Sequence, residues 1–514
     1  MTTGDLLIGG ADQRRGRRRP TWPAPIGVTI GALALAIAVV MASGIVAAVR
    51  LSGGGPQPED VLPASTFAMA RLDLDPAASQ KLAVRSLSGM FPDAPGDDLI
   101  ELRDALASDA INSLGLSYDE DVRPWLGDRY AVAGFVVSGE VEVVVVVQTR
   151  DEGKARAAVE SAEADAGIGF LDGFALLGES QDVVDAAITQ SNAGTLAEDP
   201  EFTEDVSSLA GDQIAVGWID VEVFYDEIVR DLVGEFLGDL APEVDLDGVR
   251  VALGLHATRD YVELETHVIG GPDRAAGTGD ISSLVELPTA TMAAVHLADA
   301  SVISAGLGAF AALSGLTGAV VLPDGTAVEP LPASSGDPID TGLLGQLGRI
   351  IDALSPVSGQ LTNELLPLLT GPTTVALGSL PGGASSRSDL SLLLAAKVAA
   401  PGNAEVPLLK ARDALRAAGL SAAVTIRGAT VYAATGSAYV EGLGTPGVLG
   451  ESELFQKAMG ELNDQTTFAA YVDLTDIARL QSDYPQELLP VQAVGMTASS
   501  LGSRTTVRVR VVIG

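Results

Sequence analysis

The 514-residue sequence contains no cysteine, and this absence excludes several kinds of chemistry. Disulfides, thiol catalysis, iron–sulfur clusters, thiolate zinc sites and lipidation of an N-terminal cysteine all require that side chain. The absence does not indicate the cytoplasm, because a large apolar core can be stable without disulfides. Apolar residues make up 47% of the sequence, which is enough for cores of that size.

Histidine is scarce, and catalytic motifs are missing. The chain has three histidines, His256, His267 and His296, and none lies in an HExxH or HxH arrangement. No serine lies in a GxSxG elbow. A GxGxxG match at 442–447 contains Pro446 and follows a predicted helix instead of a strand, which is typical of a loop. The sequence therefore predicts no catalytic residue and no cofactor.

Basic residues are few after position 50. Residues 51–285 hold 13 basic and 46 acidic residues, and residues 286–514 hold 12 and 20. This acidity argues against binding of nucleic acid. The acidic loop Asp119, Glu120 and Asp121 is a weak candidate for a divalent cation, but it lacks the spacing of a calcium loop, which supplies six to eight oxygens.

A 24-residue run without charge, residues 26–49, is long enough to span a bilayer. An arginine cluster at 14–19 precedes it, and Arg50 is the first charge after it. The positive-inside rule then predicts a cytoplasmic tail (1–25), a transmembrane helix (26–49) and an extracytoplasmic remainder at the plasma membrane. A cleaved signal peptide is the alternative, but an apolar signal region is usually shorter.

A second uncharged run covers residues 300–323. It is read as a buried or groove-lining helix, with contact to an apolar ligand or membrane surface, or a true span, as alternatives. A span would separate two similar halves of the chain into different compartments, which argues against it. The residues expected to make apolar contacts are Val302, Leu307, Phe310, Leu313 and Leu316.

One 30-residue segment recurs without a gap, at 195–224 and again at 448–477. Shorter matches join 62–74 to 287–299, and both copies close with Val-Ile-Gly. The recurrence predicts an internal duplication. The predicted parts are a linker (50–60), a first repeat (61–270), a second linker (271–285) and a second repeat (286–514).

Each repeat combines strand patterns with amphipathic helices. The run 141–149 is rich in valine and typical of a central strand, and 250–270 reads as a closing hairpin. We therefore predict an α+β fold in which each copy is an antiparallel sheet with helices packed on one face. The sequence leaves open whether the two copies form one continuous sheet or two bodies.

Two segments carry a family resemblance: LPASTFAMARLDLDPAASQK (62–81) and YDEDVRPWLGDRYAVAG (118–134). With the strands that follow, they resemble the actinobacterial membrane-anchored family catalogued as domain of unknown function 3352 (DUF3352). The resemblance implies a single-pass membrane protein of the cell envelope. It implies no activity and no functional residue.

The sequence thus favours a membrane-tethered extracytoplasmic protein that binds a partner, such as a protein or a lipid, or another apolar ligand, without catalysis. One alternative is an envelope hydrolase that uses two carboxylates as acid and base. Another is an architectural module whose sheets only space or dimerise. A pair of carboxylates facing each other across a cleft would favour the hydrolase.

Overall fold

The structure, a computed structural model, describes residues 55–74, 77–88, 90, 117–161, 166–226, 246–270, 279–298, 371–378, 391–397, 401–417, 419, 421–435, 448–480 and 489–514. The predicted tail (1–25), transmembrane helix (26–49) and apolar run (300–323) lie outside these residues. Among the described residues, no helix is both long and apolar enough to cross a membrane.

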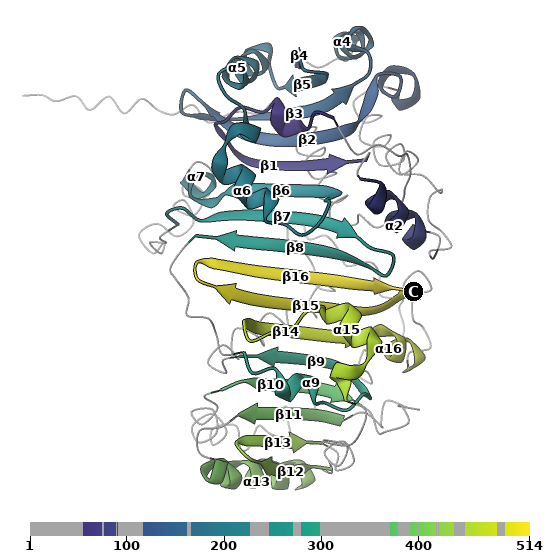
Figure 1. Ribbon diagram of the computed structural model, residues 1–514, viewed down its shortest axis with the longest axis vertical. Coiled ribbons are helices and arrows are strands. Elements are labelled where there is room, and N and C mark those ends of the chain that lie inside the picture. Colours follow the sequence, from purple (N-terminus) through teal and green to yellow (C-terminus); the bar gives the residue numbers. More distant parts are fainter. Residues whose placement is uncertain are drawn as a thin grey trace, which may run out of the picture.

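The described strands form a single sixteen-stranded sheet in which every neighbouring pair is antiparallel (Figure 1). The predicted α+β class and the antiparallel pairing of the strands are therefore confirmed. The strands are β1 (Thr66–Asp73), β2 (Leu126–Val137), β3 (Glu140–Thr149), β4 (Gly167–Leu171), β5 (Phe174–Gly178), β6 (Ala215–Asp220), β7 (Arg250–Ala257), β8 (Tyr261–Ile269), β9 (Thr291–Leu297), β10 (Thr373–Gly378), β11 (Ser391–Lys397), β12 (Ala423–Arg427), β13 (Thr430–Ala434), β14 (Thr466–Asp473), β15 (Val491–Leu501) and β16 (Arg504–Ile513).

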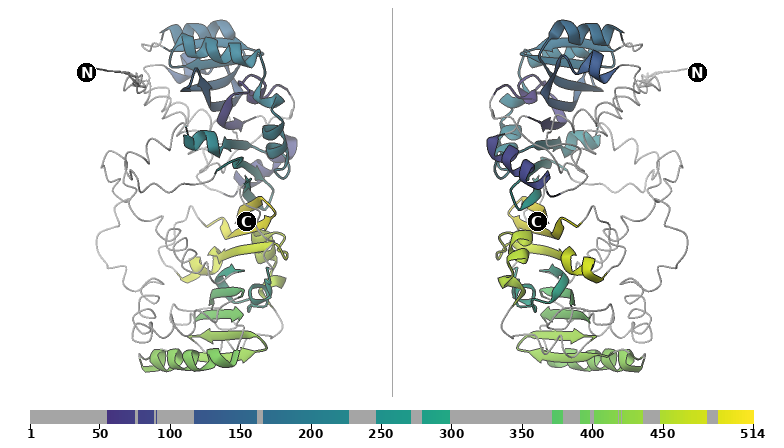
Figure 2. Two further views of the ribbon diagram at one scale, coloured as in Figure 1. Left: turned by 90° about the vertical axis from the view of Figure 1, so that its left-hand side faces the viewer. Right: turned by 90° about the vertical axis from the view of Figure 1, so that its right-hand side faces the viewer.

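The strand order reads the same from both outer edges toward the centre. From one edge it is β4-β5-β3-β2-β1-β6-β7-β8, and from the other it is β12-β13-β11-β10-β9-β14-β15-β16. Adding eight to each strand number converts the first order into the second. We call β1–β8 with their helices the N-terminal half, β9–β16 with theirs the C-terminal half, and the β8·β16 pair the seam. Figure 2 shows the two halves stacked along the long axis of the molecule.

Strand registers also recur between the halves. Met69 pairs with Trp218, and the equivalent Ala294 pairs with Tyr471. Outside the named strands, a bridge joins Pro63 to Thr195, and another joins Pro288 to Val448. Met69 and Ala294 are separated by the same number of residues as the matching segments 62–74 and 287–299. Trp218 and Tyr471 are likewise separated by the same number of residues as 195–224 and 448–477.

Side-chain packing repeats as well. An edge-to-face pair of rings joins Phe202 to Trp218 with centroids 5.5 Å apart, and Phe455 to Tyr471 with centroids 5.0 Å apart. Such pairs stabilise a core beyond the area that they bury. The preceding helix starts equivalently in each half, where the side chain of Asp199 or Ser452 accepts the N–H of the buried phenylalanine.

The helices and short turns lie before and between these strands in the sequence, and the helices pack on the sheet (Figure 1). Short turns are η1 (Pro58–Asp60), η2 (Tyr118–Val122), η3 (Leu196–Glu198) and η12 (Leu449–Glu451). The helices are α2 (Ala78–Ser88), α4 (Glu152–Ser161), α5 (Gln181–Ser191), α6 (Pro200–Ser207), α7 (Val221–Phe224), α9 (Ser282–Val285), α13 (Pro401–Ala417), α15 (Glu453–Met459) and α16 (Leu474–Leu480).

The predicted placement of helices on one face is wrong for the outer strands. On β3, Val144 and Val146 belong to a core that includes α5, whereas Val145 and Val147 belong to a second core that includes α4. Successive strand residues point to opposite faces, so helices cover both faces of β3. The physical reason is the uninterrupted valine run, which leaves apolar side chains on both sides of the strand.

Candidate functional site

The seam carries ion pairs on one face of the sheet. Arg508 lies directly across from Glu265 in the β8·β16 register, and Arg510 lies across from Glu263. Arg508 Nη2 is 2.7 Å from Glu265 Oε1, and Arg510 Nε donates to Glu263 Oε2. Both glutamates are 1% exposed. Burial of an unpaired carboxylate would be costly. The arginines of the C-terminal half therefore stabilise the buried glutamates of the N-terminal half.

Glu265 is the most heavily hydrogen-bonded acid of the seam. Its Oε2 accepts the N–H of Ala210 at 2.7 Å, and its Oε1 lies 3.1 Å from His267 Nε2. Burial opposes ionisation of Glu265, but the bonds from His267, the Ala210 N–H and Arg508 outweigh it and lower the pKa to about 2. Glu265 is therefore a permanent anion at neutral pH.

A serine, a histidine and a glutamate lie in a hydrogen-bonded row at this point. Ser208 Oγ is 2.7 Å from His267 Nδ1, and the other ring nitrogen faces Glu265. The order resembles that of a hydrolase triad. However, Ser208 Oγ also lies 2.6 Å from the Asp205 carbonyl at the end of α6, and Glu265 is shared with Arg508. These contacts make the row a part of the ion network at the seam.

His256 extends the network along β7. Its Nε2 is 3.7 Å from Glu263 Oε1, and its ring meets the Tyr261 ring edge to face. Burial lowers the pKa of His256, and the opposing effect of Glu263 is weaker. Arg510 stacks over Tyr261 with its guanidinium carbon 4.5 Å from the ring centre. No motif in the sequence predicts this network, because its arginines lie on β16 and its acids on β8, far apart in the chain.

A second polar cluster lies under α6 in the N-terminal half. Asp205 is 1% exposed, and its Oδ2 accepts Arg250 Nε at 2.7 Å and Trp218 Nε1 at 3.1 Å. The hydrogen bond to Asp205 raises the pKa of Arg250. In the C-terminal half, the equivalent residues of Asp205, Trp218 and Arg250 are Ala458, Tyr471 and Ala493. One position in the fold is therefore ionic in one half and apolar in the other.

The opposite face of the central strands carries no charge. Adjacent residues pair across six strands in a row, which we call the apolar row: Leu264, Val509, Met496, Ala470, Val295 and Val375. Every member is half-buried or exposed, and Leu264 and Val375 are each 38% exposed. The two flanking rows on this face are also uncharged. They are Thr266-Val507-Ala498-Phe468-Leu297-Thr373 and Val262-Val511-Val494-Val472-Ala293-Leu377.

A buried histidine lies in the C-terminal half. His296 on β9 is 0% exposed, and its Nδ1 is 2.9 Å from Thr374 Oγ1, which lies 2.7 Å from Ser283 Oγ. Among the described residues, His296 Nε2 has no hydrogen-bond partner. Burial lowers the pKa of His296 to about 4, and the charge of Asp280 opposes this only in part. His296 is therefore neutral at pH 7.

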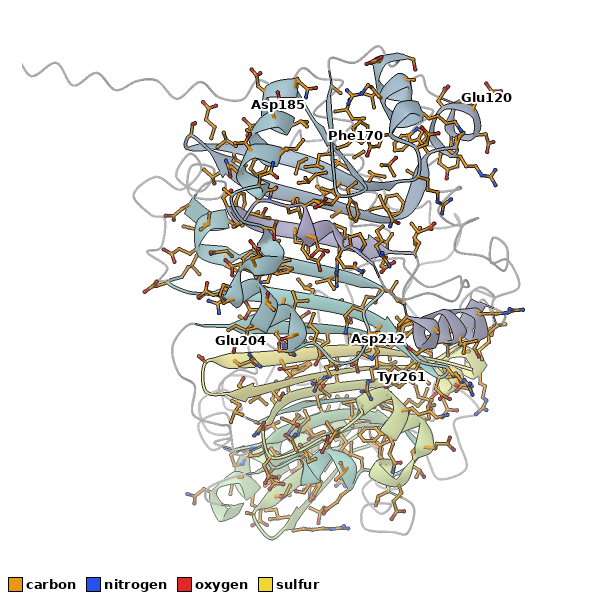
Figure 3. All side chains as sticks on the ribbon, turned by 45° about the horizontal axis from the view of Figure 1, so that its top comes forward. Glu120, Phe170, Asp185, Glu204, Asp212 and Tyr261 are labelled. Atoms are coloured by element: carbon orange, nitrogen blue, oxygen red, sulfur yellow. The ribbon has the colours of Figure 1, made fainter. Side chains whose placement is uncertain are left out.

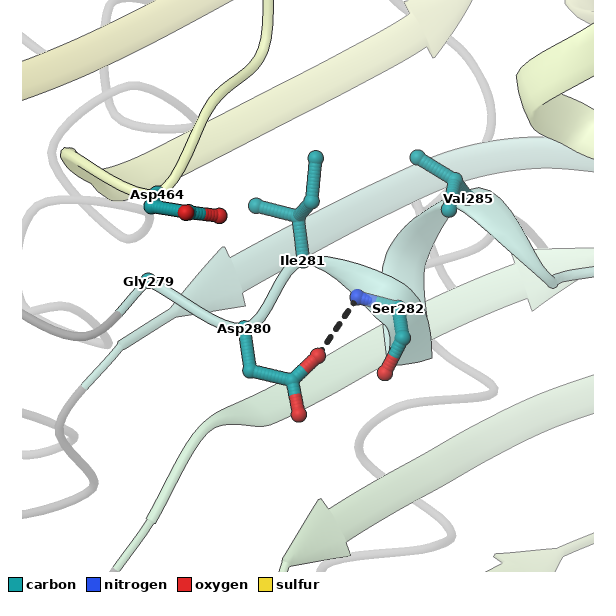
Figure 4. Close-up of a pocket in the computed structure, with 6 residues that line it drawn as sticks. All are labelled: Gly279, Asp280, Ile281, Ser282, Val285 and Asp464. Atoms are coloured by element: carbon teal, nitrogen blue, oxygen red, sulfur yellow. Dashed lines mark hydrogen bonds between the residues drawn. The ribbon is translucent and has the colours of Figure 1, made fainter.

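A shallow concavity of about 450 Å³ lies beside α9 (Figure 4). Two acidic residues line it, Asp280 and Asp464, and Asp280 Oδ1 accepts the Ser282 N–H at 3.0 Å. The other lining residues are Gly279, Ile281, Ser282 and Val285. Two carboxylates are fewer than a dedicated cation site needs.

The predicted metal candidates do not gather into a site. Asp119 pairs with Arg123 at 3.0 Å, and Asp121 Oδ2 accepts the Ser117 N–H at 2.8 Å. In the part of the chain that the structure describes, no three possible metal ligands lie together. Figure 3 places Glu120 at the outer end of the N-terminal half, away from Tyr261 at the seam. The predicted apolar-contact residues, Val302, Leu307, Phe310, Leu313 and Leu316, lie outside the described residues.

Residues 26–171 match a family model described as "Protein of unknown function (DUF3352)". The resemblance to that family is therefore confirmed over these residues. No curated protein matches the chain. Crystal forms III and I of TP0453 are similar at 10% and 12% identity, each with a TM-score of 0.23. The matches cover 45% and 46% of this chain and 88% of each TP0453 chain. At these TM-scores, the likeness carries no argument about fold or function.

Proposed function

We propose a binding role outside the cytoplasm for this protein, whose residues 26–171 match the model of a family of unknown function. In this proposal, residues 26–49 tether an internally duplicated protein to the membrane. The protein binds the aliphatic chain of a lipid against the uncharged face of its sheet, without catalysis. The observation that carries the proposal is the apolar row, with its exposed Leu264 and Val375.

The contrast between the two faces supports this choice. At the seam, one face holds Glu263, Glu265, Arg508 and Arg510, and alternate residues of the same strands are uncharged and mostly aliphatic on the other face. The apolar row exposes Leu264 and Val375, and the rows on either side of it add no charge to this face. Exposed apolar side chains grouped on an uncharged face are typical of an interaction site. An aliphatic chain fits such a surface because it brings no polar group that the surface would leave unpaired.

The charge pattern of the N-terminus supports the tether. Arginines precede the uncharged run 26–49, which favours an N-terminus in the cytoplasm and the sheet outside it. A reporter that is active only outside the cytoplasm, fused after Gly514, is expected to be active, and a reporter that is active only inside is expected to be silent. The reverse pattern would overturn the topology.

The hydrolase alternative receives less support. A general acid must hold a proton near neutral pH, which requires a raised pKa. Glu265 has a pKa of about 2, and Glu263 is paired with Arg510. Each buried glutamate of the seam is therefore held in an ion pair with an arginine of the C-terminal half.

Photo-crosslinking tests the proposed surface. Membranes that contain the full chain are incubated with a phospholipid carrying a diazirine on its acyl chain, irradiated, and analysed by peptide mass spectrometry. We expect crosslinks on the strands of the apolar row in addition to residues 26–49. Leu264→Glu and Val375→Glu should each reduce crosslinking to the row several-fold, because a carboxylate is costly beside a hydrocarbon chain.

The control is Val406→Glu on α13. Val406 is a 56% exposed aliphatic residue away from the row, so its substitution should leave crosslinking to the row unchanged. Crosslinks confined to residues 26–49 would contradict the binding surface and favour a purely architectural protein. A loss of crosslinking in the control variant as large as in the row variants would also contradict it.

A further inference from the structure

The seam joins two equivalent strands, β8 and β16. Equivalent residues follow from the register, since Trp218 pairs with Ala252 and Tyr471 pairs with Gly495. One strand further, Ala252 pairs with His267 and Gly495 with Arg510. His267 is therefore equivalent to Arg510, and Glu265, two residues earlier, is equivalent to Arg508.

Glu265 and Arg508 are also partners. They lie directly opposite each other across the antiparallel seam, with Arg508 donating to Glu265 from both Nε and Nη2. A residue that faces its own equivalent lies on the approximate two-fold axis between the halves. In a symmetric pair of identical halves, this position would hold two copies of one residue.

Opposite charges at this position make the seam selective. Two N-terminal halves paired through β8 would place Glu265 against Glu265, with both carboxylates buried. Two C-terminal halves paired through β16 would place Arg508 against Arg508. Like charges in contact at an interface exclude the wrong pairing, and the opposite charges favour the correct one.

We propose that the seam is a recognition surface through which the N-terminal half selects the C-terminal half and rejects a second copy of itself. The partner that fits β8 is a strand that presents an arginine opposite Glu265. The flanking contacts agree, because Arg510 neutralises Glu263, and Lys457 lies 3.0 Å from Asp260 across the same boundary. This inference does not depend on the proposed lipid binding.

Cleavage of the folded full chain tests the proposal. A protease site is inserted between Gly270 and Gly279, which is the covalent connection between the halves. After cleavage, a tag on one half is used to recover the other. The wild-type halves should stay together. Glu265→Arg should weaken their association by roughly a hundredfold, because it puts two cations in one buried site. Glu265→Arg with Arg508→Glu should restore most of it.

A neutral pair and a mixing experiment complete the test. Glu265→Gln and Arg508→Gln each remove one charge of the direct pair and leave the other, whereas the double substitution removes both charges, so it should hold the halves together better than either single variant. This set keeps the test valid if the reversed variants do not fold. When two differently tagged chains are cleaved and mixed, each N-terminal half should recover C-terminal halves only.

Four results would overturn the proposal. The first is separation of the wild-type halves after cleavage. The second is association of the Glu265→Arg halves as tight as that of the wild type. The third is failure of both double variants to restore the association. The fourth is recovery of N-terminal halves by differently tagged N-terminal halves in a yield similar to that of C-terminal halves.

Discussion

Asp205→Ala is expected to destabilise the protein by about 3–5 kcal/mol, the cost of removing one partner of a buried ion pair. The substitution leaves Arg250 and the indole N–H of Trp218 without their shared acceptor under α6. Arg250 then keeps only its ion pair with the exposed Glu201, and a largely buried charge that has lost its main partner costs more than the carboxylate contributed. Chemical denaturation of the full chain, followed by tryptophan fluorescence and circular dichroism, measures the loss.

The C-terminal half supplies a compensating variant. It carries Ala458, Tyr471 and Ala493 at the equivalents of Asp205, Trp218 and Arg250. Asp205→Ala combined with Trp218→Tyr and Arg250→Ala should therefore recover most of the lost stability, because no buried charge remains.

An exposed neighbour provides the matched control. Glu201 is 63% exposed by side chain and also pairs with Arg250, at 3.2 Å. Glu201→Ala should cost less than about 1 kcal/mol, since exposed ion pairs contribute little. Two results would contradict this explanation. One is a triple variant that is no more stable than Asp205→Ala, and the other is a loss of unfolding free energy in Glu201→Ala as large as that in Asp205→Ala.

Stability is expected to fall by about 3 kcal/mol between pH 6.5 and pH 4 through His296 alone. The folded-state pKa of His296 is about 4, against an ordinary value of 6.5. Between these values, the unfolded chain binds a proton that the folded protein excludes. The contribution of the neutral ring is therefore present above pH 6.5 and is lost as the pH falls toward 4.

His296→Gln tests this directly. The amide can still bond to Thr374 Oγ1, but it does not titrate. The difference in unfolding free energy between pH 7 and pH 4 should be smaller by about 3 kcal/mol in the variant than in the wild type. In the wild type, the ring resonances of His296 should not titrate above pH 5. Parallel pH profiles for the two proteins would show that His296 contributes nothing to the pH dependence.

Local patterns predicted the elements of the fold well. The valine run in 141–149 corresponds to β3, and the closing hairpin predicted at 250–270 corresponds to β7 and β8. These patterns succeed because strand periodicity is set by which side chains must be buried. The sequence of β3 also explains why the predicted helix placement is wrong, since an unbroken run of valines at 143–147 puts apolar side chains on both faces of the strand, and both need cover.

Functional groups were harder to predict. The weak cation candidate was predicted from three acids adjacent in sequence, Asp119, Glu120 and Asp121. In the structure, Asp119 pairs with Arg123, and Asp121 accepts the Ser117 N–H. Glu263 and Glu265 looked like ordinary strand acids, because Arg508 and Arg510 lie more than 240 positions away. The sequence around a residue does not show that it forms an ion pair when its partner lies on a strand far away in the chain.

The sequence by itself determined the class of fold, the recurrence of residues between the halves and the absence of thiol chemistry. Those properties depend on composition and short-range periodicity. Only the tertiary structure decided that both halves share one sheet, that Glu265 faces its own equivalent as Arg508, and that the opposite face carries no charge. Pairing between strands brings these residues together, and the chain order does not specify which edges will meet.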